Sequence, residues 1–134
     1  MIILAMIAGI VIPRYYSQLE KGVITEAVAK LSAIRQGEEA FNLEYGTYIH
    51  SGDAAAAPVP AFSWTVLGID SPDNTKFTYA ITGTATTFTA TATRVDDAST
   101  TLDCPGKTIV ITNAGVFSGT HPFGPTPDAG ATCS

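Results

Sequence analysis

The first twelve residues, MIILAMIAGIVI, constrain this chain most, because they form an apolar run without a single polar side chain. Exposing its large side chains to water would cost roughly 12–24 kcal/mol, more than the whole stability of a typical domain. The run must therefore be buried in a membrane, in a partner protein or in the chain's own core. Its large apolar residues are Ile2, Ile3, Leu4, Met6, Ile7, Ile10, Val11 and Ile12.

The chain's own core is a poor place for this run. A helix that is apolar on every side needs neighbours all round, and a chain of 134 residues has few elements to supply them. The run is shorter than the roughly 20 residues that span a bilayer, and it lacks the basic start and cleavage site of a secretory signal. We interpret it as the last part of a longer apolar helix, and its large residues as the polymerisation and membrane surface.

Pro13 ends the apolar run. A proline at this point removes the hydrogen bond to the Gly9 carbonyl, which predicts a kink or a melted turn between Gly9 and Pro13. Apolar residues then recur at helical spacing, with charged residues such as Glu38 between them, which predicts an amphipathic helix that stops near Tyr45 before Gly46. The apolar positions are Ile24, Ala27, Val28, Leu31, Ile34 and Phe41.

The remainder of the chain predicts a loop, a sheet and a tail. Residues 46–75 are a Gly-, Pro- and Ala-rich loop with one apolar flap, residues 76–118 hold the strands, and residues 119–134 lack regular structure. Short connections make the sheet antiparallel, and the fold class is α+β, a long helix on about four strands. The flap is Phe62, Trp64, Val66 and Leu67. The predicted strands are Lys76–Ile81, Thr86–Arg94, Lys107–Thr112 and Val116–Ser118. The side chains expected to face the helix are Phe77, Tyr79, Phe88, Ile109 and Ile111.

The two cysteines, Cys104 and Cys133, lie in the last third of the chain. A pair placed to hold a free C-terminus predicts a disulfide in an oxidising compartment, worth about 3–4 kcal/mol in the chain-entropy description. Two unrelated thiols are the alternative. A metal site is disfavoured because the chain has no CxxC and no nearby pair of histidines.

Residues 7–48, IAGIVIPRYYSQLEKGVITEAVAKLSAIRQGEEAFNLEYGTY, resemble the N-terminal helix of type IV pilins and type II secretion pseudopilins. The resemblance rests on the apolar run before Pro13, the amphipathic helix after it and the Tyr45–Tyr48 segment. Residues 103–119 are similar to pilin headgroups. The resemblance implies a helical filament of identical subunits, an inner-membrane stage before assembly, an assembly machinery and a prepilin peptidase.

The chain departs from the pilin pattern at its start. The leader peptide, the peptidase site after glycine and the N-terminal glutamate of the family have no counterpart here. We therefore expect further residues of the mature helix to precede Met1. Residues 1–24 are predicted as the membrane and filament-core half of the helix, and residues 25–134 as the globular headgroup.

The remaining polar residues form no catalytic or metal site by their spacing. His50 and His121 are isolated and are expected on the surface, and Glu38 and Glu39 are adjacent on a helix, so they point in different directions. Asp96, Asp97 and Asp103 lack the alternation of a calcium loop. The net charge of −5 gives no direct indication of nucleic acid binding, because phosphate contacts need clustered cations.

The sequence thus predicts a structural, non-enzymatic subunit of a type IV pilus-like filament at the cell surface, without cofactor. Adhesion, motility and DNA uptake are all compatible with such a filament. One alternative is the major pseudopilin of a type II secretion system. Another is a membrane-anchored binding module that stays monomeric.

Overall fold

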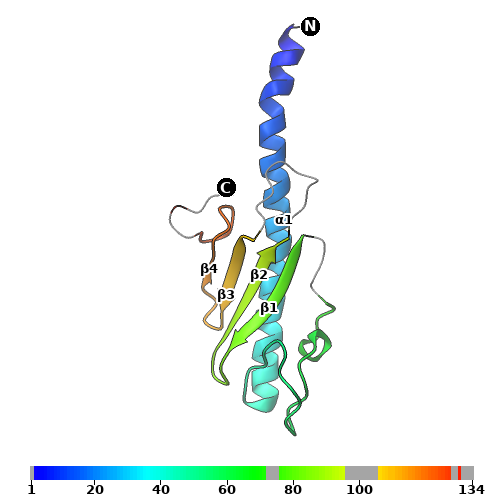
Figure 1. The fold of residues 1–134 in the computed structure, drawn as a ribbon, viewed down its shortest axis with the longest axis vertical. Helices are drawn as coiled ribbons and strands as arrows, with labels where there is room; N and C mark the ends of the chain where they lie inside the picture. Colours follow the sequence, from blue (N-terminus) through cyan, green and yellow to red (C-terminus); the bar gives the residue numbers. More distant parts are fainter. Residues whose placement is uncertain (1, 72–75, 96–105, 128–129, 131–134) are drawn as a thin grey trace.

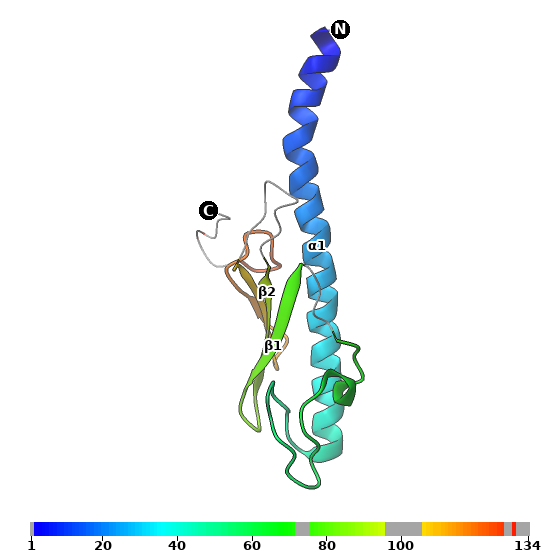
Figure 2. The ribbon, with the colours of Figure 1, turned by 45° about the vertical axis from the view of Figure 1, so that its right-hand side comes forward.

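The computed structural model describes residues 2–71, 76–95, 106–127 and 130, with side chains described from residue 21 onward in these ranges. The C-terminal half of the long helix α1 lies along a four-stranded sheet, and its N-terminal part extends beyond the sheet (Figures 1 and 2). The predicted α+β architecture is confirmed. The elements in chain order are α1 (Ile2–Tyr45), the 3-10 helix η1 (Trp64–Leu67), β1 (Phe77–Gly83), β2 (Phe88–Arg94), β3 (Thr108–Thr112) and β4 (Phe117–Ser118).

Helix α1 runs without interruption through Gly9 and Pro13, so the backbone between them is not a melted turn. A bend of the axis there stays a prediction. The helix ends at Tyr45, as expected, because Gly46 adopts a left-handed φ of 74°. The Gly46 N–H donates to the Asn42 carbonyl at 2.7 Å, which satisfies one of the last carbonyls of the helix.

The sheet is antiparallel throughout, in the order β1-β2-β3-β4. The turn between β1 and β2 is Thr84–Thr87, closed by the Thr84 N–H donating to the Thr87 carbonyl at 2.9 Å. Gly83 makes this turn possible, because its φ of 146° and its contact with the turn backbone leave no room for a side chain. Strand β1 therefore ends two residues later than predicted, and β2 begins two residues later.

The core lies between α1 and the inner face of the sheet. From α1 it takes the predicted stripe, except that Val28 is only half-buried, and from the sheet it takes the alternate residues of each strand. All five sheet residues expected to face the helix are buried. The buried sheet residues are Phe77, Tyr79, Ile81, Phe88, Ala90, Ala92, Ile109 and Ile111.

The loop between α1 and β1 packs on both layers. Residues 48–51 run beside the β1–β2 hairpin, where the Ser51 N–H donates to the Ile81 carbonyl at 3.0 Å and the Ile81 N–H to Ser51 Oγ at 2.9 Å. Further along, η1 sits against α1 at Gly37, where an added methyl group would lie 2.6 Å from the Leu67 carbonyl oxygen. Leu67 is buried and Trp64 is half-buried against the core, which confirms the predicted flap.

Candidate functional surfaces

The residues predicted for polymerisation, Ile2 to Ile12, all belong to the N-terminal part of α1, whose side chains lie outside the described ones. Cys104 and Cys133 also lie outside the described residues. The polymerisation surface and the disulfide therefore stay predictions. Where side chains are described, no helix combines the length and apolar character needed to cross a membrane.

One face of α1 is not covered by the sheet. Its exposed residues follow one another at intervals of three and four, and many of them are small: Gly22, Ala29, Ala33 and Ala40. Leu43, near the end of the same face, is 88 % exposed. Small side chains allow the backbones of two helices to approach closely, so this face can accept another helix along most of the headgroup.

Glu38 is fully buried in the core stripe of α1, which contradicts its expected place among the solvent-facing charges. Its Oε2 accepts a hydrogen bond from the Ile49 N–H at 3.1 Å. Its Oε1 has no hydrogen-bond partner among the described residues. Burial raises the pKa of Glu38 from 4.5 to about 7, against the lowering effects of the Ile49 N–H and of His50.

The start of the α1–β1 loop is fixed around Glu38 by a second group of polar side chains. His50 Nδ1 lies 3.3 Å from Asp53 Oδ2, and the same oxygen accepts the His50 N–H at 2.7 Å. The Tyr48 hydroxyl donates to Glu39 Oε1 at 3.3 Å, and burial, then Glu39, raise the pKa of Tyr48. His50 is thus mostly buried, with a side chain only 15 % exposed, rather than solvated.

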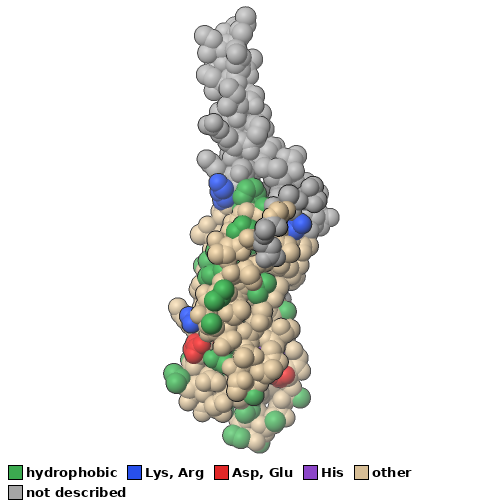
Figure 3. Space-filling view, turned by 90° about the vertical axis from the view of Figure 1, so that its left-hand side faces the viewer, with side chains coloured by type: hydrophobic (Ala, Val, Ile, Leu, Met, Phe, Trp, Pro, Cys, Tyr) green, Lys and Arg blue, Asp and Glu red, His purple; other side chains and the backbone are tan. Residues whose placement is uncertain are grey.

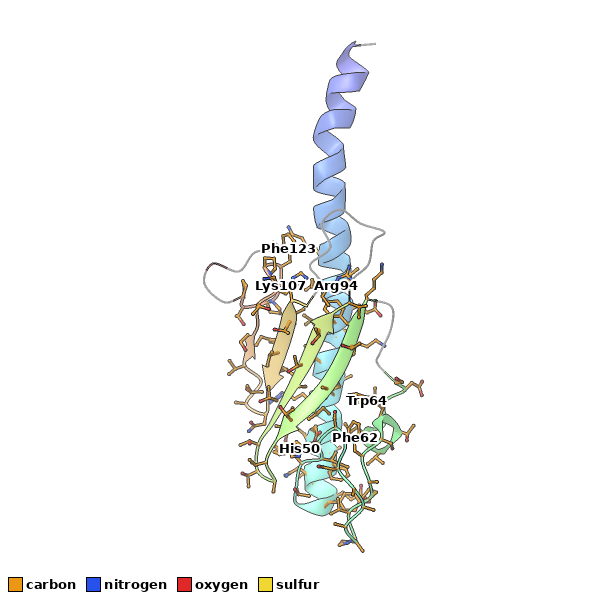
Figure 4. All side chains as sticks on the ribbon, in the orientation of Figure 1. His50, Phe62, Trp64, Arg94, Lys107 and Phe123 are labelled. Atoms are coloured by element: carbon orange, nitrogen blue, oxygen red, sulfur yellow. The ribbon has the colours of Figure 1, made fainter. Side chains whose placement is uncertain are left out.

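An aromatic and cationic cluster closes the opposite end of the sheet, where Figure 4 places Arg94, Lys107 and Phe123 together. The Arg94 guanidinium lies 5.7 Å from the Phe77 ring centroid and donates to the Val95 carbonyl at 2.9 Å. His121, expected on the surface, is only 1 % exposed. Its Nδ1 accepts the Phe123 N–H at 3.2 Å, so the tail packs back over this end of the sheet.

The outer face of the sheet is a regular array of threonines. Its nine positions on β1, β2 and β3 form three rows across the strands, and seven of the nine are threonine. The rows, in strand order, are Thr78–Thr93–Thr108, Ala80–Thr91–Val110 and Thr82–Thr89–Thr112. No described helix or strand packs on this face, and Figures 1 and 2 show α1 on the opposite side.

Charges are distributed unevenly over the headgroup. Every acidic residue with a described side chain lies on α1 or in the α1–β1 loop. Lys76, Arg94 and Lys107 stand together at one end of the antiparallel sheet, before β1, at the end of β2 and before β3. Uncharged side chains and backbone make up most of the face in Figure 3. No pocket was found among the described residues, so the candidate sites are surfaces.

One family model matches most of α1 and the first two strands of the sheet. Residues 13–108, more than half of the chain, match the family described as type IV minor pilin ComP, DNA uptake sequence receptor. The chain belongs to this type IV minor pilin family. The chain has no significant match among curated proteins or among solved structures.

The pilin match covers α1 from Pro13, the α1–β1 loop, β1, β2 and the first residue of β3. It therefore includes both layers of the headgroup rather than the helix alone. Membership of this family implies a subunit related to the type IV pilus of the cell surface. This agrees with the predicted pilin family and leaves the specific assignment as a major pilin or a pseudopilin without support.

Proposed function

We propose that this protein is a minor subunit of a type IV pilus that takes part in DNA uptake, by entering the filament through α1 and exposing its headgroup to DNA. The match of residues 13–108 to the family of a DNA uptake sequence receptor is the observation that carries the proposal. It favours a minor pilin over the major pilin or pseudopilin. The proposed role is assembly and binding, without catalysis or a cofactor.

Assembly through α1 follows from the burial requirement of its apolar start. Before assembly, the inner membrane holds residues 2–12, and the prepilin peptidase and assembly machinery act on the chain at that stage. During assembly, the helix leaves lipid and packs against the helices of other subunits, so one apolar environment replaces another. The exposed small residues of α1, such as Ala29, Ala33 and Ala40, extend the helix-packing face along the headgroup.

The same arrangement leaves the sheet side of the headgroup available for DNA. Because α1 covers only the inner face of the sheet, packing through the outer side of α1 does not use the outer face. The net charge of −5 argues against binding through bulk electrostatics. Recognition by this headgroup therefore depends on the local charge distribution and on hydrogen bonds.

The test uses the organism that produces the protein, with the Ile7→Asp/Ile10→Asp double variant. An aspartate at the centre of an apolar helix costs about 2.5–3.5 kcal/mol in a membrane, and two should prevent both insertion and packing. We expect no immunolabelling of sheared filaments and at least a tenfold drop in transformation by added DNA. Ala61→Asp, at an exposed position of the α1–β1 loop and away from the packing face of α1, is the control for an added charge.

Three results would count against the proposal. Filaments labelled as densely in the double variant as in the parent would show that residues 2–12 do not drive assembly. Normal transformation after complete deletion of the gene would remove the DNA uptake role. Retained surface display of the protein without filament labelling, in the unaltered strain, would favour the membrane-anchored monomer.

A further inference from the structure

We propose that residues 47–51 form a pH-sensitive clasp, which closes over the edge of β1 while Glu38 is protonated and opens when Glu38 is ionised. The inference concerns regulation of the headgroup and does not depend on the proposed function. It is carried by the contacts of this segment with both layers of the headgroup. It is also carried by the buried Glu38 carboxyl beside the segment, where one oxygen has no partner among the described residues.

The clasp is attached to the β1–β2 hairpin mainly through its backbone. The Tyr48 N–H donates to the Ala85 carbonyl at 3.1 Å, and the Ser51 N–H donates to the Ile81 carbonyl at 3.0 Å. The Ile81 N–H in turn donates to Ser51 Oγ at 2.9 Å. Because β1 is an edge strand, the contacts with Ile81 occupy backbone groups that would otherwise be open to an added strand.

On its other side, the clasp is attached to α1 at Ile49. The Ile49 side chain is buried in the core, and its N–H donates to Glu38 Oε2 at 3.1 Å. Glu38 is itself fully buried, and its Oε1 has no partner among the described residues. A protonated carboxyl can occupy such a site at modest cost, whereas a carboxylate buried with one neutral donor is not compensated.

The charged groups closest to Glu38 do not balance a negative charge there. Glu39 and Asp53 oppose its ionisation, and His50 favours it. Asp53 Oδ2 accepts the His50 N–H at 2.7 Å and lies 3.3 Å from His50 Nδ1, so a positive charge on His50 would be shared with a second carboxylate. The Tyr48 hydroxyl donates to Glu39 Oε1. Burial is the largest effect and raises the pKa of Glu38 to about 7.

The other elements around Glu38 add no compensating charge. Arg35, one turn earlier on α1, donates through Nε to the Asn113 carbonyl of the β3–β4 turn at 3.4 Å. The 3-10 helix η1 consists of uncharged residues. The inner face of the sheet presents Tyr79 and, at the end away from the β1–β2 turn, Arg94. Among the described side chains, none donates a charged hydrogen bond to Glu38.

A glycine stands at each end of the clasp. Gly46 and Gly52 have left-handed φ angles of 74° and 89°, and a methyl group added to either would meet no atom within 4 Å. Side-chain packing therefore does not restrain the two ends, and both glycines can change φ and ψ at low cost. Water reaches the Glu38 carboxylate when the segment between them moves away, so ionisation favours the open form.

Hydrogen exchange of the isotope-labelled full chain in detergent micelles measures the opening. The Ile49 amide reports the clasp, and the amide of Ala92, fully buried on β2, reports unfolding of the whole headgroup. Opening returns the pKa of Glu38 from about 7 to 4.5, so protection of the Ile49 amide should fall about seventyfold between pH 5 and pH 8. Glu38→Gln cannot ionise and should reduce this change to about twofold or less.

Two controls separate clasp opening from global unfolding. Local opening exposes little surface, so exchange at Ile49 should be nearly independent of urea at low concentration, whereas exchange at Ala92 should accelerate with urea. Ser51→Ala removes the side-chain oxygen that accepts the Ile81 N–H. This variant should speed exchange at Ile49 about fivefold at both pH values and keep the pH dependence.

Any of three findings would overturn the clasp. Protection at Ile49 that does not change between pH 5 and pH 8 would show that ionisation of Glu38 is not coupled to this segment. A fall in protection that persists in Glu38→Gln would assign the pH dependence to another group, such as His50. Equal urea dependence at Ile49 and Ala92 would show that the segment opens only with the whole headgroup.

Discussion

Replacing Glu38 with glutamine tests whether one buried carboxyl controls the pH dependence of headgroup stability. Glu38 is fully buried between α1 and the start of the α1–β1 loop, with the Ile49 N–H as a donor to one oxygen and no described partner for the other. The charged groups around it are His50, which favours its ionised form, and Asp53 and Glu39, which oppose it. Burial outweighs them and raises the pKa of Glu38 to about 7.

The sign of the effect follows from proton binding. The pKa is 4.5 in the unfolded chain and about 7 in the folded one, so between these values the folded protein binds more protons. The free energy of unfolding therefore falls as pH rises through this window. At 1.36 kcal/mol for each pKa unit, the stability present below pH 4.5 and lost above pH 7 is about 3 kcal/mol.

Glutamine keeps an oxygen that can accept the Ile49 N–H but cannot ionise. We expect Glu38→Gln to have nearly the stability of the unaltered protein at pH 5 and to exceed it by up to about 3 kcal/mol at pH 8. Urea unfolding of the full chain in detergent micelles, followed by circular dichroism at both pH values, measures this. Glu39→Gln removes the neighbouring charge from a half-buried position and should leave the fall in stability in place.

Either of two results would contradict this role of Glu38. If the unaltered protein and Glu38→Gln lose the same stability between pH 5 and pH 8, another group is responsible for the pH dependence. If Glu38→Gln is the less stable of the two at pH 8, the ionised carboxylate has a stabilising partner that outweighs its desolvation.

Two further predictions concern packing and the C-terminal tail. Gly37→Ala should lower the free energy of unfolding by about 1–3 kcal/mol, because its methyl group would meet the η1 backbone. Gly22→Ala should raise it by about 0.5–1 kcal/mol, because no neighbouring atom lies within 4 Å of the added methyl group. Equal melting temperatures for the two variants would contradict this packing. If Cys104 and Cys133 form a disulfide, an alkylating reagent should label them only after reduction. Reduction should also lower the free energy of unfolding by about 3 kcal/mol. Labelling of both cysteines without a reductant would exclude the bond.

Periodicity allowed most of the fold to be predicted. The helical spacing of Ile24, Leu31 and Ile34 located the buried stripe, and alternation in the strands located the inner face of the sheet. Gly46 gave the helix end because it can adopt the left-handed conformation that a C-cap needs. The ends of the strands were predicted less accurately. The turn at Thr84–Thr87 is set by hydrogen bonds, which the alternation of apolar and polar residues does not reveal.

The buried polar residues were missed where residue type was given more weight than position. Glu38 follows Ile34 by four residues and precedes Phe41 by three, so its spacing places it on the apolar stripe. Arg94 likewise continues the inward alternation of β2. His121 follows the last strand and has no periodic signal, so its burial depends on tertiary packing of the tail. For Glu38 and Arg94, position in the helix or strand therefore predicted burial. A polar side chain that is buried in this way needs hydrogen-bond partners, which the backbone can supply.

The net charge of −5 and a DNA-binding role are compatible if charge is considered by face. Electrostatic interactions between exposed groups are screened over about 8 Å at physiological salt. An α-helix with its side chains is about 10–12 Å across, so carboxylates on the far side of α1 lie more than one screening length behind the sheet. A ligand on the outer face of the sheet would therefore be largely screened from Glu26 and Glu44. The slope of log K against log salt would report how many lysines and arginines contribute to DNA binding by this headgroup, which the dissociation constant alone does not.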